Sequence, residues 1–304
     1  MLRLSAAIAA SALLVTVSNV GCSSNQAPVG DGCVGENAAA LKTCAKGTTI
    51  TGVDISYYQG DVSWAQIKGS GRQFGFTRIS DGLKHPDTRF EQNWLAMKSV
   101  GLVRGSYQYF RASQDVGLQV QLVIDALADA GGLQAGDLPP VLDLESSDGV
   151  GATEVVARAK AWLAAVETTI HAKPIVYTSA AMSDVIGNAF SGYVLWVAHY
   201  TTGCPLMPAG WNDWQFWQNS ESGTVPGVSG GADTDFFNGT LPELQALTLT
   251  STGVAPRTAP AIRQTGPSFA GRNTPNDGSQ GATIGHGDPS DTAETQSAPL
   301  TPCR

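Results

Sequence analysis

The amino-acid sequence predicts an α/β fold, a single β/α barrel of eight strands from which some of the usual helices are missing. Short apolar or alternating segments recur between Gly, Pro and polar clusters, helical patterns separate several of them, and acidic residues stand at strand ends. Strands that alternate with helices indicate a mainly parallel sheet. The 304 residues are enough for one such barrel, which commonly uses roughly 200 to 250, although length alone does not decide the number of domains.

Eight segments have the length and composition of strands. In chain order they are Gly52–Tyr57, Phe74–Ile79, Val103–Phe110, Val141–Glu145, Pro174–Thr178, Val194–Tyr200, Asp213–Gln218 and Ala232–Phe237. Three of the gaps between them carry an amphipathic helical pattern. These are Glu91–Val100, Val116–Ala130 and Thr153–Ile170, the last with Val156, Ala159, Leu163 and Val166 on one face.

The later gaps differ from the earlier ones. Thr202–Trp211 and Glu221–Gly231 are short or rich in Gly and Pro, so we expect the last helices of a full barrel to be absent. A flat doubly wound sheet is the competing architecture. It is disfavoured because no glycine-rich turn follows the first strand, as a dinucleotide-binding sheet would require.

The segment Leu138-Pro139-Pro140-Val141-Leu142-Asp143-Leu144-Glu145 contains the strongest chemical signal. Alternate residues of a strand share a face, so Asp143 and Glu145 point the same way. Burial and like charges raise the pKa of a carboxyl, which is how a general acid is made. The C-terminal rim of a barrel is where such enzymes do chemistry. The structural alternative is that Asp143 caps the strand and Glu145 is solvated.

Two further strands place acids similarly. Asp54 follows Gly52-Val53 in the first strand, and Asp233 begins the last, within Gly231-Ala232-Asp233-Thr234-Asp235-Phe236. The first and last strands of a closed barrel are neighbours, so Asp54 and Asp233 should meet across the seam. We therefore expect four acids to line one pocket. Aromatic side chains suited to stacking on sugar rings stand at or near strand ends. They are Tyr57, Tyr107, Tyr109, Trp196, Tyr200 and Trp217.

The ordered set of motifs resembles glycoside hydrolase family 25, the muramidase lysozymes, over Gly52 to Gly239. The matching pieces are Gly52-Val53-Asp54-Ile55-Ser56 with Gln59-Gly60 and Trp64, Gly105-Ser106-Tyr107-Gln108-Tyr109-Phe110-Arg111, Pro140-Val141-Leu142-Asp143-Leu144-Glu145, Ile175-Val176-Tyr177-Thr178-Ser179, Leu195-Trp196-Val197-Ala198 with Tyr200, Phe216-Trp217-Gln218, and Asp233 with Phe236. The resemblance implies hydrolysis of the β-1,4 bond between N-acetylmuramic acid and N-acetylglucosamine in peptidoglycan, without a cofactor.

The resemblance also implies roles for the acids. Glu145 would protonate the leaving oxygen. Asp143 would stabilise a developing charge, either on the oxocarbenium-like carbon or on an acetamido group acting as internal nucleophile. Asp54 and Asp233 would orient and tune that pair. Where the family usually has Lys-Ala-Thr-Glu-Gly, this chain has Arg78-Ile79-Ser80-Asp81-Gly82. Asp81 and Arg78 are candidate substrate contacts, and the change affects substrate preference or rate because Arg does not replace Lys neutrally.

Three other functions compete with this hypothesis. Gly227-Val228-Ser229-Gly230-Gly231 fits the GxSxG motif of serine hydrolases, but no helix follows it and the one later histidine is His286. A peptidoglycan-binding protein would keep the pocket without turnover. A glycosidase acting on another N-acetylated glycan, such as chitin, would share the chemistry but not the substrate.

The chain ends have the composition of segments outside a folded domain. Met1 to Cys22 is typical of an export signal: Arg3 is positive, Ala6 to Val17 is too short to span a bilayer, and Cys22 stands where a bacterial lipoprotein is lipidated. We expect a tether at 23–48, the catalytic barrel at 49–247 and a low-complexity tail at 248–304. The protein would be exported, and either anchored to a membrane through Cys22 or secreted.

Composition and cysteine spacing narrow the partners. The net charge of −8 and the lack of a basic run argue against nucleic acid. The scattered histidines and the absence of CxxC argue against a zinc site. Cysteines occur at positions 22, 33, 44, 204 and 303, and Cys33 with Cys44 would close the shortest loop. The expected partner is a peptidoglycan strand, bound by a monomer.

Overall fold

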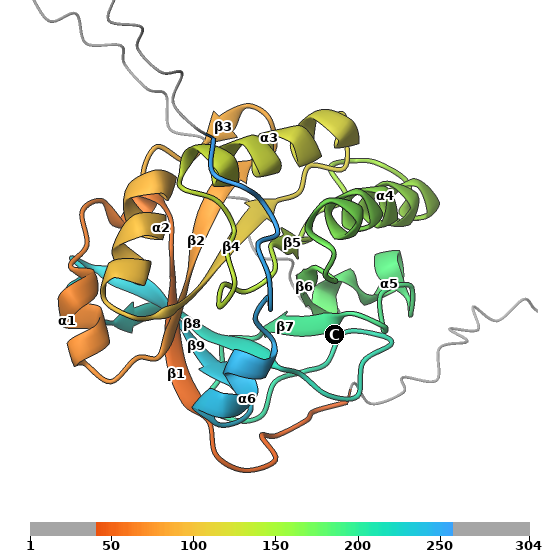
Figure 1. Cartoon of the computed structure of the whole chain (residues 1–304). Helices are drawn as coiled ribbons and strands as arrows, with labels where there is room; N and C mark the ends of the chain where they lie inside the picture. The colour runs from red at the N-terminus through yellow and green to blue at the C-terminus, as the bar shows by residue number, and fades with distance from the viewer. Residues whose placement is uncertain (1–40, 258–304) are drawn as a thin grey trace, which may run out of the picture. The chain divides into compact units, whose positions relative to one another are not determined.

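Eight strands close into a barrel in the computed structural model, which describes residues 41–257 (Figure 1). They are β1 (Ile50–Ile55), β2 (Phe74–Asp81), β4 (Val103–Tyr109), β5 (Val141–Asp143), β6 (Ile175–Ser179), β7 (Val194–Ala198), β8 (Phe216–Thr224) and β9 (Gly231–Phe237). The two-residue β3 (His85–Pro86) pairs with the end of β2. Because β1 pairs with both β2 and β9, the sheet has no flat doubly wound form, and the predicted barrel is confirmed.

The last strand runs against the others. Apart from the short β3, which is antiparallel to β2, strands β1 to β8 pair in parallel around the barrel, whereas β9 is antiparallel to both β8 and β1. The predicted gap beginning at Glu221 is partly strand, since β8 continues to Thr224. The remaining link is too short for the crossover that a parallel pair needs, so β8 and β9 form a hairpin. The start of β9 therefore lies at the rim where the parallel strands end.

The three predicted helices are present, and shorter ones lie in the β1–β2 and β6–β7 connections and after β9. The predicted helices are α2 (Phe90–Ser99), α3 (Val116–Asp129) and α4 (Ala152–Ile170); the others are α1 (Trp64–Gly69), α5 (Ser183–Ile186), α6 (Leu241–Ala246) and the 3-10 turns η1 (Tyr57–Gln59) and η2 (Ala180–Met182). Asp115 caps α3 through the backbone N–H of Leu118. No helix within residues 41–257 is long and apolar enough to cross a membrane. As predicted, the β7–β8 link, which is fully described, carries no helix.

Aromatic side chains fill the inside of the barrel. Phe74, Phe76 and Phe216 meet edge to face, and Phe76 stacks on Trp196 with ring centroids 4.2 Å apart. These rings leave no room for a neighbouring Cβ. A methyl group on Gly105 would lie 2.3 Å from the Phe76 ring, so this strand position requires glycine. The stack supports Trp196, which lines the pocket described below.

The folded unit is longer at both ends than 49–247. Before β1, Cys44 forms a disulfide with Cys204, and Thr43 bonds to the backbone of the same loop. After α6, Val254 forms a bridge with Leu133, and Arg257 pairs with acids of α3. The expected Cys33–Cys44 pairing is wrong because folding brings Cys44 to Cys204. The predicted signal, Cys22, Cys33, Cys303 and most of the predicted tail lie outside the described residues.

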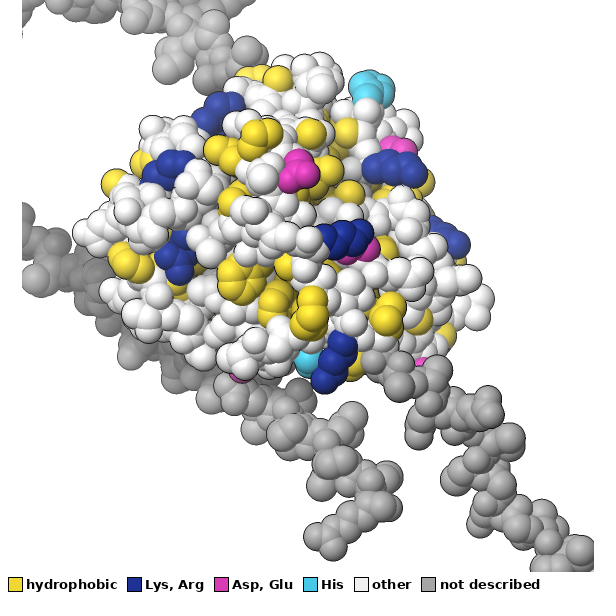
Figure 2. Space-filling view, turned by 90° about the horizontal axis from the view of Figure 1, so that it is seen from below, with side chains coloured by type: hydrophobic (Ala, Val, Ile, Leu, Met, Phe, Trp, Pro, Cys, Tyr) yellow, Lys and Arg dark blue, Asp and Glu magenta, His cyan; other side chains and the backbone are white. Residues whose placement is uncertain are grey.

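The face drawn in Figure 2 carries few clustered charges. On the face drawn in Figure 2, Lys and Arg side chains lie singly among uncharged and hydrophobic side chains. The described residues of that face therefore show no basic patch of the kind that binds a nucleic-acid backbone.

Candidate active site

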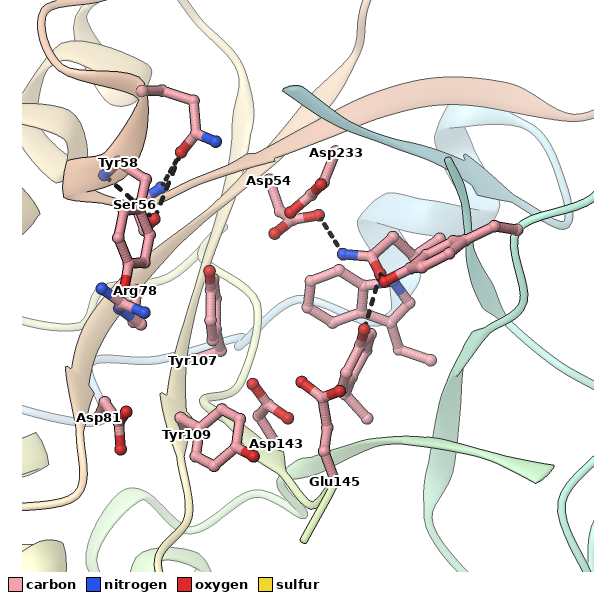
Figure 3. Close-up of a pocket in the computed structure, with 15 residues that line it drawn as sticks. Asp54, Ser56, Tyr58, Arg78, Asp81, Tyr107, Tyr109, Asp143, Glu145 and Asp233 are labelled. Atoms are coloured by element: carbon pink, nitrogen blue, oxygen red, sulfur yellow. Dashed lines mark hydrogen bonds between the residues drawn. The ribbon is translucent and has the colours of Figure 1, made fainter. Parts of the chain in front are cut away.

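A pocket of about 320 Å³ opens at the rim where the parallel strands end (Figure 3). Every strand of the barrel, or the loop that follows it, contributes to its wall. The lining residues are Asp54, Ser56, Tyr58, Gln59, Arg78, Asp81, Tyr107, Tyr109, Asp143, Glu145, Tyr177, Trp196, Tyr200, Gln218 and Asp233. The structure thus brings all four predicted acids to one pocket, together with six of the eight predicted substrate contacts.

Asp143 and Glu145 form one wall, and Figure 3 shows them side by side. Strand β5 ends at Asp143, but Leu144 still bonds to the backbone of β6, which keeps the chain extended and turns Glu145 to the same side. Asp143 is buried at 4 % exposure, whereas Glu145 meets solvent at the mouth. Burial first, and then the charge of Glu145, raise the pKa of Asp143 well above its usual value. The pocket walls limit the hydration of Glu145, which raises its pKa as well.

Asp54 and Asp233 form the opposite wall. They are directly opposed in the β1–β9 ladder, as the closure of the barrel predicts. Burial raises the pKa of Asp54 well above its usual value, and the charges of Asp233 and Asp235 add to this. Burial also raises the pKa of Asp233 to about 6. Two pairs of carboxyls with raised pKa values therefore face each other across the pocket.

The polar and aromatic contacts predicted on β2 and β4 also lie in the pocket. Arg78 donates from Nε to Asp87 at 3.2 Å, and its guanidinium lies over the rings of Tyr57 and Tyr58, 4.9 and 5.2 Å from their centroids. Asp81 accepts two bonds from Arg111, at 2.5 and 2.6 Å. Tyr107, Tyr109, Trp196 and Tyr200 are the predicted aromatics that line the pocket.

Two predicted contacts lie outside the pocket. Trp217 alternates with Phe216 and Gln218 on β8, so it faces outward, where its indole N–H donates to the carbonyl of His199 at 2.8 Å. Tyr57 begins the 3-10 turn after β1, and that turn carries Tyr58 toward the pocket instead. Position near a strand end places a residue close to the rim but does not decide which way its side chain points, and these two side chains do not line the pocket.

Five lining residues were not predicted as site residues. They are Ser56, Tyr58, Gln59, Tyr177 and Gln218. The signal for two of them was present in the sequence. Tyr177 shares the inward face of β6 with Ile175, and Gln218 shares that of β8 with Phe216. By contrast, the direction of Tyr58 depends on a tight turn whose geometry no alternation pattern reveals.

Neither the serine motif nor a metal cluster supplies an alternative centre. Ser229 lies in the exposed loop between β8 and β9 and does not line the pocket. Among residues 41–257 no group of three or more His, Cys, Asp or Glu side chains is placed to hold a metal ion.

Comparison with protein families identifies the barrel. Residues 53–228, more than half of the chain, match the family described as glycosyl hydrolases family 25. The chain belongs to this family. The family 25 match includes Asp54, Asp143 and Glu145 and ends before Asp233, which the structure nevertheless places opposite Asp54.

Relatives and solved structures agree with this assignment. The chain is 36 % identical to the protein YegX of Escherichia coli (strain K12) over 207 residues, which is 65 % of this chain and 73 % of YegX. It is 30 % identical over 211 residues to lysozyme M1 of Streptomyces globisporus, covering 65 % of this chain and 71 % of that protein. The crystal structure of the bacterial lysozyme from Streptomyces coelicolor superposes with a TM-score of 0.62 at 28 % identity, covering 66 % of this chain and 97 % of that one.

Proposed function

We propose that this family 25 protein is an N-acetylmuramidase, a lysozyme that hydrolyses the β-1,4 bond between N-acetylmuramic acid and N-acetylglucosamine in peptidoglycan. The observation that carries the proposal is the convergence of Asp54, Asp143, Glu145 and Asp233 at one aromatic-walled pocket. The similarity to a protein named lysozyme M1, and to one from Chalaropsis named N,O-diacetylmuramidase at 28 % identity, supports the reaction and the substrate.

Glu145 is the general acid in this proposal. It lies at the solvent-exposed mouth, where a glycosidic oxygen of a bound polymer can reach it. Its raised pKa keeps it protonated at pH values where an ordinary carboxyl has lost its proton. It can therefore donate that proton to the leaving oxygen as the bond breaks.

Asp143 stabilises the charge that develops on the sugar. It lies deeper than Glu145, and its Oδ1 is buried with no hydrogen-bond partner among the described residues. A buried acceptor of this kind is costly unless something bonds to it. An acetamido N–H of the substrate would satisfy it, and the same carboxylate would then stabilise either an oxocarbenium-like carbon or an acetamido group acting as the nucleophile.

The other lining residues orient the substrate. Asp54 and Asp233 would hold the opposite side of the sugar and tune the charge of the catalytic pair across the pocket. Trp196 and the tyrosines offer flat surfaces for sugar rings, and Arg78 and Asp81 offer a donor and an acceptor at one end of the pocket. Arg78 is held between Asp87 and two tyrosine rings, so its planar group is presented in a fixed orientation.

Reducing-end analysis of digested peptidoglycan tests the proposal. The wild-type protein should release fragments that end in N-acetylmuramic acid, and Glu145→Gln should release none while its thermal unfolding curve remains cooperative. Fragments ending in N-acetylglucosamine would contradict the muramidase assignment. Binding to walls without any release would favour a binding protein, and faster release from chitin would favour a different glycan.

We propose further that the protein is exported to reach this substrate, which lies outside the cytoplasmic membrane, and that Cys22 carries a lipid anchor. The sequence of residues 1–22 supports this. Labelling of cells with an alkyne fatty acid should mark the wild-type protein and not Cys22→Ala. Unlabelled wild-type protein found wholly in the medium would contradict the anchor and leave the enzymatic proposal intact.

A further inference from the structure

A buried amide connects the rim of the pocket to Asp54. Gln218 on β8 is 4 % exposed, and its Oε1 accepts from the phenols of Tyr177 at 2.6 Å and Tyr200 at 3.1 Å. Its Nε2 donates to Oδ2 of Asp54 at 2.8 Å. Figure 3 shows the bond that reaches Asp54, which lies beside Asp233. Four separate elements thus meet at one side chain.

The two phenols determine which way the amide points. If the amide were reversed, its oxygen would face the carboxylate of Asp54, where two acceptors repel unless Asp54 is protonated. The buried hydroxyl of Tyr177 would also lose its acceptor, which is costly inside a protein. The observed orientation satisfies every partner, and it directs an N–H at Asp54. The backbone carbonyl of Gln218 also accepts from His199, next to Tyr200, so it positions that rim segment too.

We propose that Gln218 is a positioning residue for the muramidase reaction: oriented by Tyr177 and Tyr200, it holds Asp54 in one rotamer and favours its carboxylate form. This inference rests on the proposed function and concerns the same pocket. Gln218 itself transfers no proton. It acts through Asp54. Tyr200 is half exposed at the rim, where a substrate would meet it, and its bond to Gln218 connects that part of the wall to Asp54.

Other charged and titratable groups also surround Asp54, and most of them oppose its ionisation. They are Asp233 and Asp235 on β9, Asp143 on β5, Tyr107 on β4 and Tyr177 on β6. Burial and the neighbouring acids raise the pKa of Asp54, and the hydrogen bond from Gln218 lowers it. Removing that bond should therefore raise the pKa of Asp54 further, because a hydrogen bond to a charged group favours the charged form.

The first experiment is a pH profile of kcat/KM for the wild type, Gln218→Met and Tyr177→Phe. Methionine has a similar volume but cannot donate to Asp54. We expect the acid limb to move to higher pH by about one unit in Gln218→Met, and by less in Tyr177→Phe, where the amide loses one of its two orienting donors. An unmoved limb, or a shift to lower pH, would overturn the proposal.

Gln108→Met is the matched control. Gln108 is another buried strand amide with three hydrogen bonds, to Ser80, Gln119 and Trp162, and it does not line the pocket. Its loss should lower stability without moving the pH profile. If Gln108→Met moved the acid limb as far as Gln218→Met, the effect would come from loss of a buried amide in general, and the proposal would be wrong.

A second readout does not depend on activity. A carboxyl whose pKa is higher in the folded state than in the unfolded state makes the protein less stable as pH rises between the two values. Gln218→Met widens that difference for Asp54, so the Tm gap between wild type and variant should grow as pH rises through the folded-state pKa of Asp54, which burial holds above its usual value. A constant gap would overturn the inference even if the variant were inactive. Failure of the proposed function would appear separately, as a wild type that releases no fragments.

Discussion

The acids of the pocket work against the stability of the fold. Burial disfavours the charged form of Asp233 and raises its pKa to about 6, and the pKa values of Asp54, Asp143 and Glu145 are raised as well. Side chains that are costly to bury together in this number are retained for chemistry rather than for folding. The stability that each buried carboxyl group costs should be measurable by replacing it.

Asp233→Asn should therefore raise stability at neutral pH. The folded protein holds the proton of Asp233 more tightly than the unfolded chain does, so the stability linked to this group is complete below pH 4 and is lost as pH rises through about 6. We expect the variant to be about 1 to 2 kcal/mol more stable than wild type at pH 8, allowing for partial exposure, and no more stable at pH 4. Urea unfolding at the two pH values measures this. A variant that is less stable at both would contradict it.

Arg78→Lys tests the residue at which the chain departs from its family's usual motif. Lysine would lose the planar contact with Tyr57 and Tyr58 and the Nε bond to Asp87. We expect KM for peptidoglycan to rise several-fold with kcat changed little, because in the proposed function Arg78 contacts the substrate away from Asp143 and Glu145. Steady-state kinetics with Lys173→Arg, a surface substitution outside the pocket, is the control. An equal fall in kcat would instead give Arg78 a part in the chemical step.

Single residues were predictable where an alternating strand fixed their direction. Asp54, Asp143, Glu145 and Asp233 were found because acidic side chains in apolar strands are rare and their spacing is informative. The directions of Tyr57 and Trp217 were not predictable in this way, because being near a rim does not determine orientation: Tyr57 lies in a turn and Trp217 faces the outside of β8.

At the level of elements, the barrel core is packed so closely that some strand positions have no room for a side chain. Gly105 on β4 faces the Phe76 ring, and that ring supports Trp196, which lines the pocket. Glycine weakens the interior of a strand, but at this position it leaves the space that the Phe76 ring occupies.

Gly105→Ala should consequently destabilise the protein and reduce activity together. The added methyl would lie 2.3 Å from the Phe76 ring, and moving a packed ring typically costs about 1 to 3 kcal/mol. Gly69→Ala is the control, because nothing lies within 4 Å of its Cβ position at the end of α1. Thermal unfolding and lysis assays measure both effects. A Gly105→Ala variant as stable as Gly69→Ala would show that the barrel core relaxes freely.

Helices and strands were predictable to within a few residues where the pattern was long. The apolar residues on one face predicted helix α4, although Val155 is buried in place of the predicted Val156. The direction of β9 was not predictable by the same means. Alternation is identical in parallel and antiparallel strands, and only the short link after Thr224 excludes a parallel crossover.

For the molecule as a whole, the chain segments before and after the barrel contribute to its stability. The Cys44–Cys204 disulfide joins residues 160 positions apart, and Val254 forms a β-bridge with Leu133, which is also distant from it in the sequence. Their composition predicted a tether and a tail instead, because contacts with loops that are distant in the sequence leave no local pattern of hydrophobic residues.

A chain shortened to residues 49–247 should thus be less stable than one of residues 41–257. It lacks the disulfide, whose closure of a long loop is worth about 2 to 4 kcal/mol, and it lacks the buried side chains of Leu249 and Val254. Thermal unfolding of both chains, and of the longer chain carrying Cys44→Ala and Cys204→Ala, separates the two contributions. Equal Tm values for all three would show that the predicted boundaries were sufficient.

The hairpin that ends the barrel has a consequence for biosynthesis. Asp54 is made among the first residues of the domain and Asp233 among the last, and they become neighbours only when β9 inserts beside β1. Pairings this distant along the chain form late in folding. A polypeptide in which β9 has not yet inserted therefore lacks Asp233 at the rim, and the pocket is complete only after the final strand has docked.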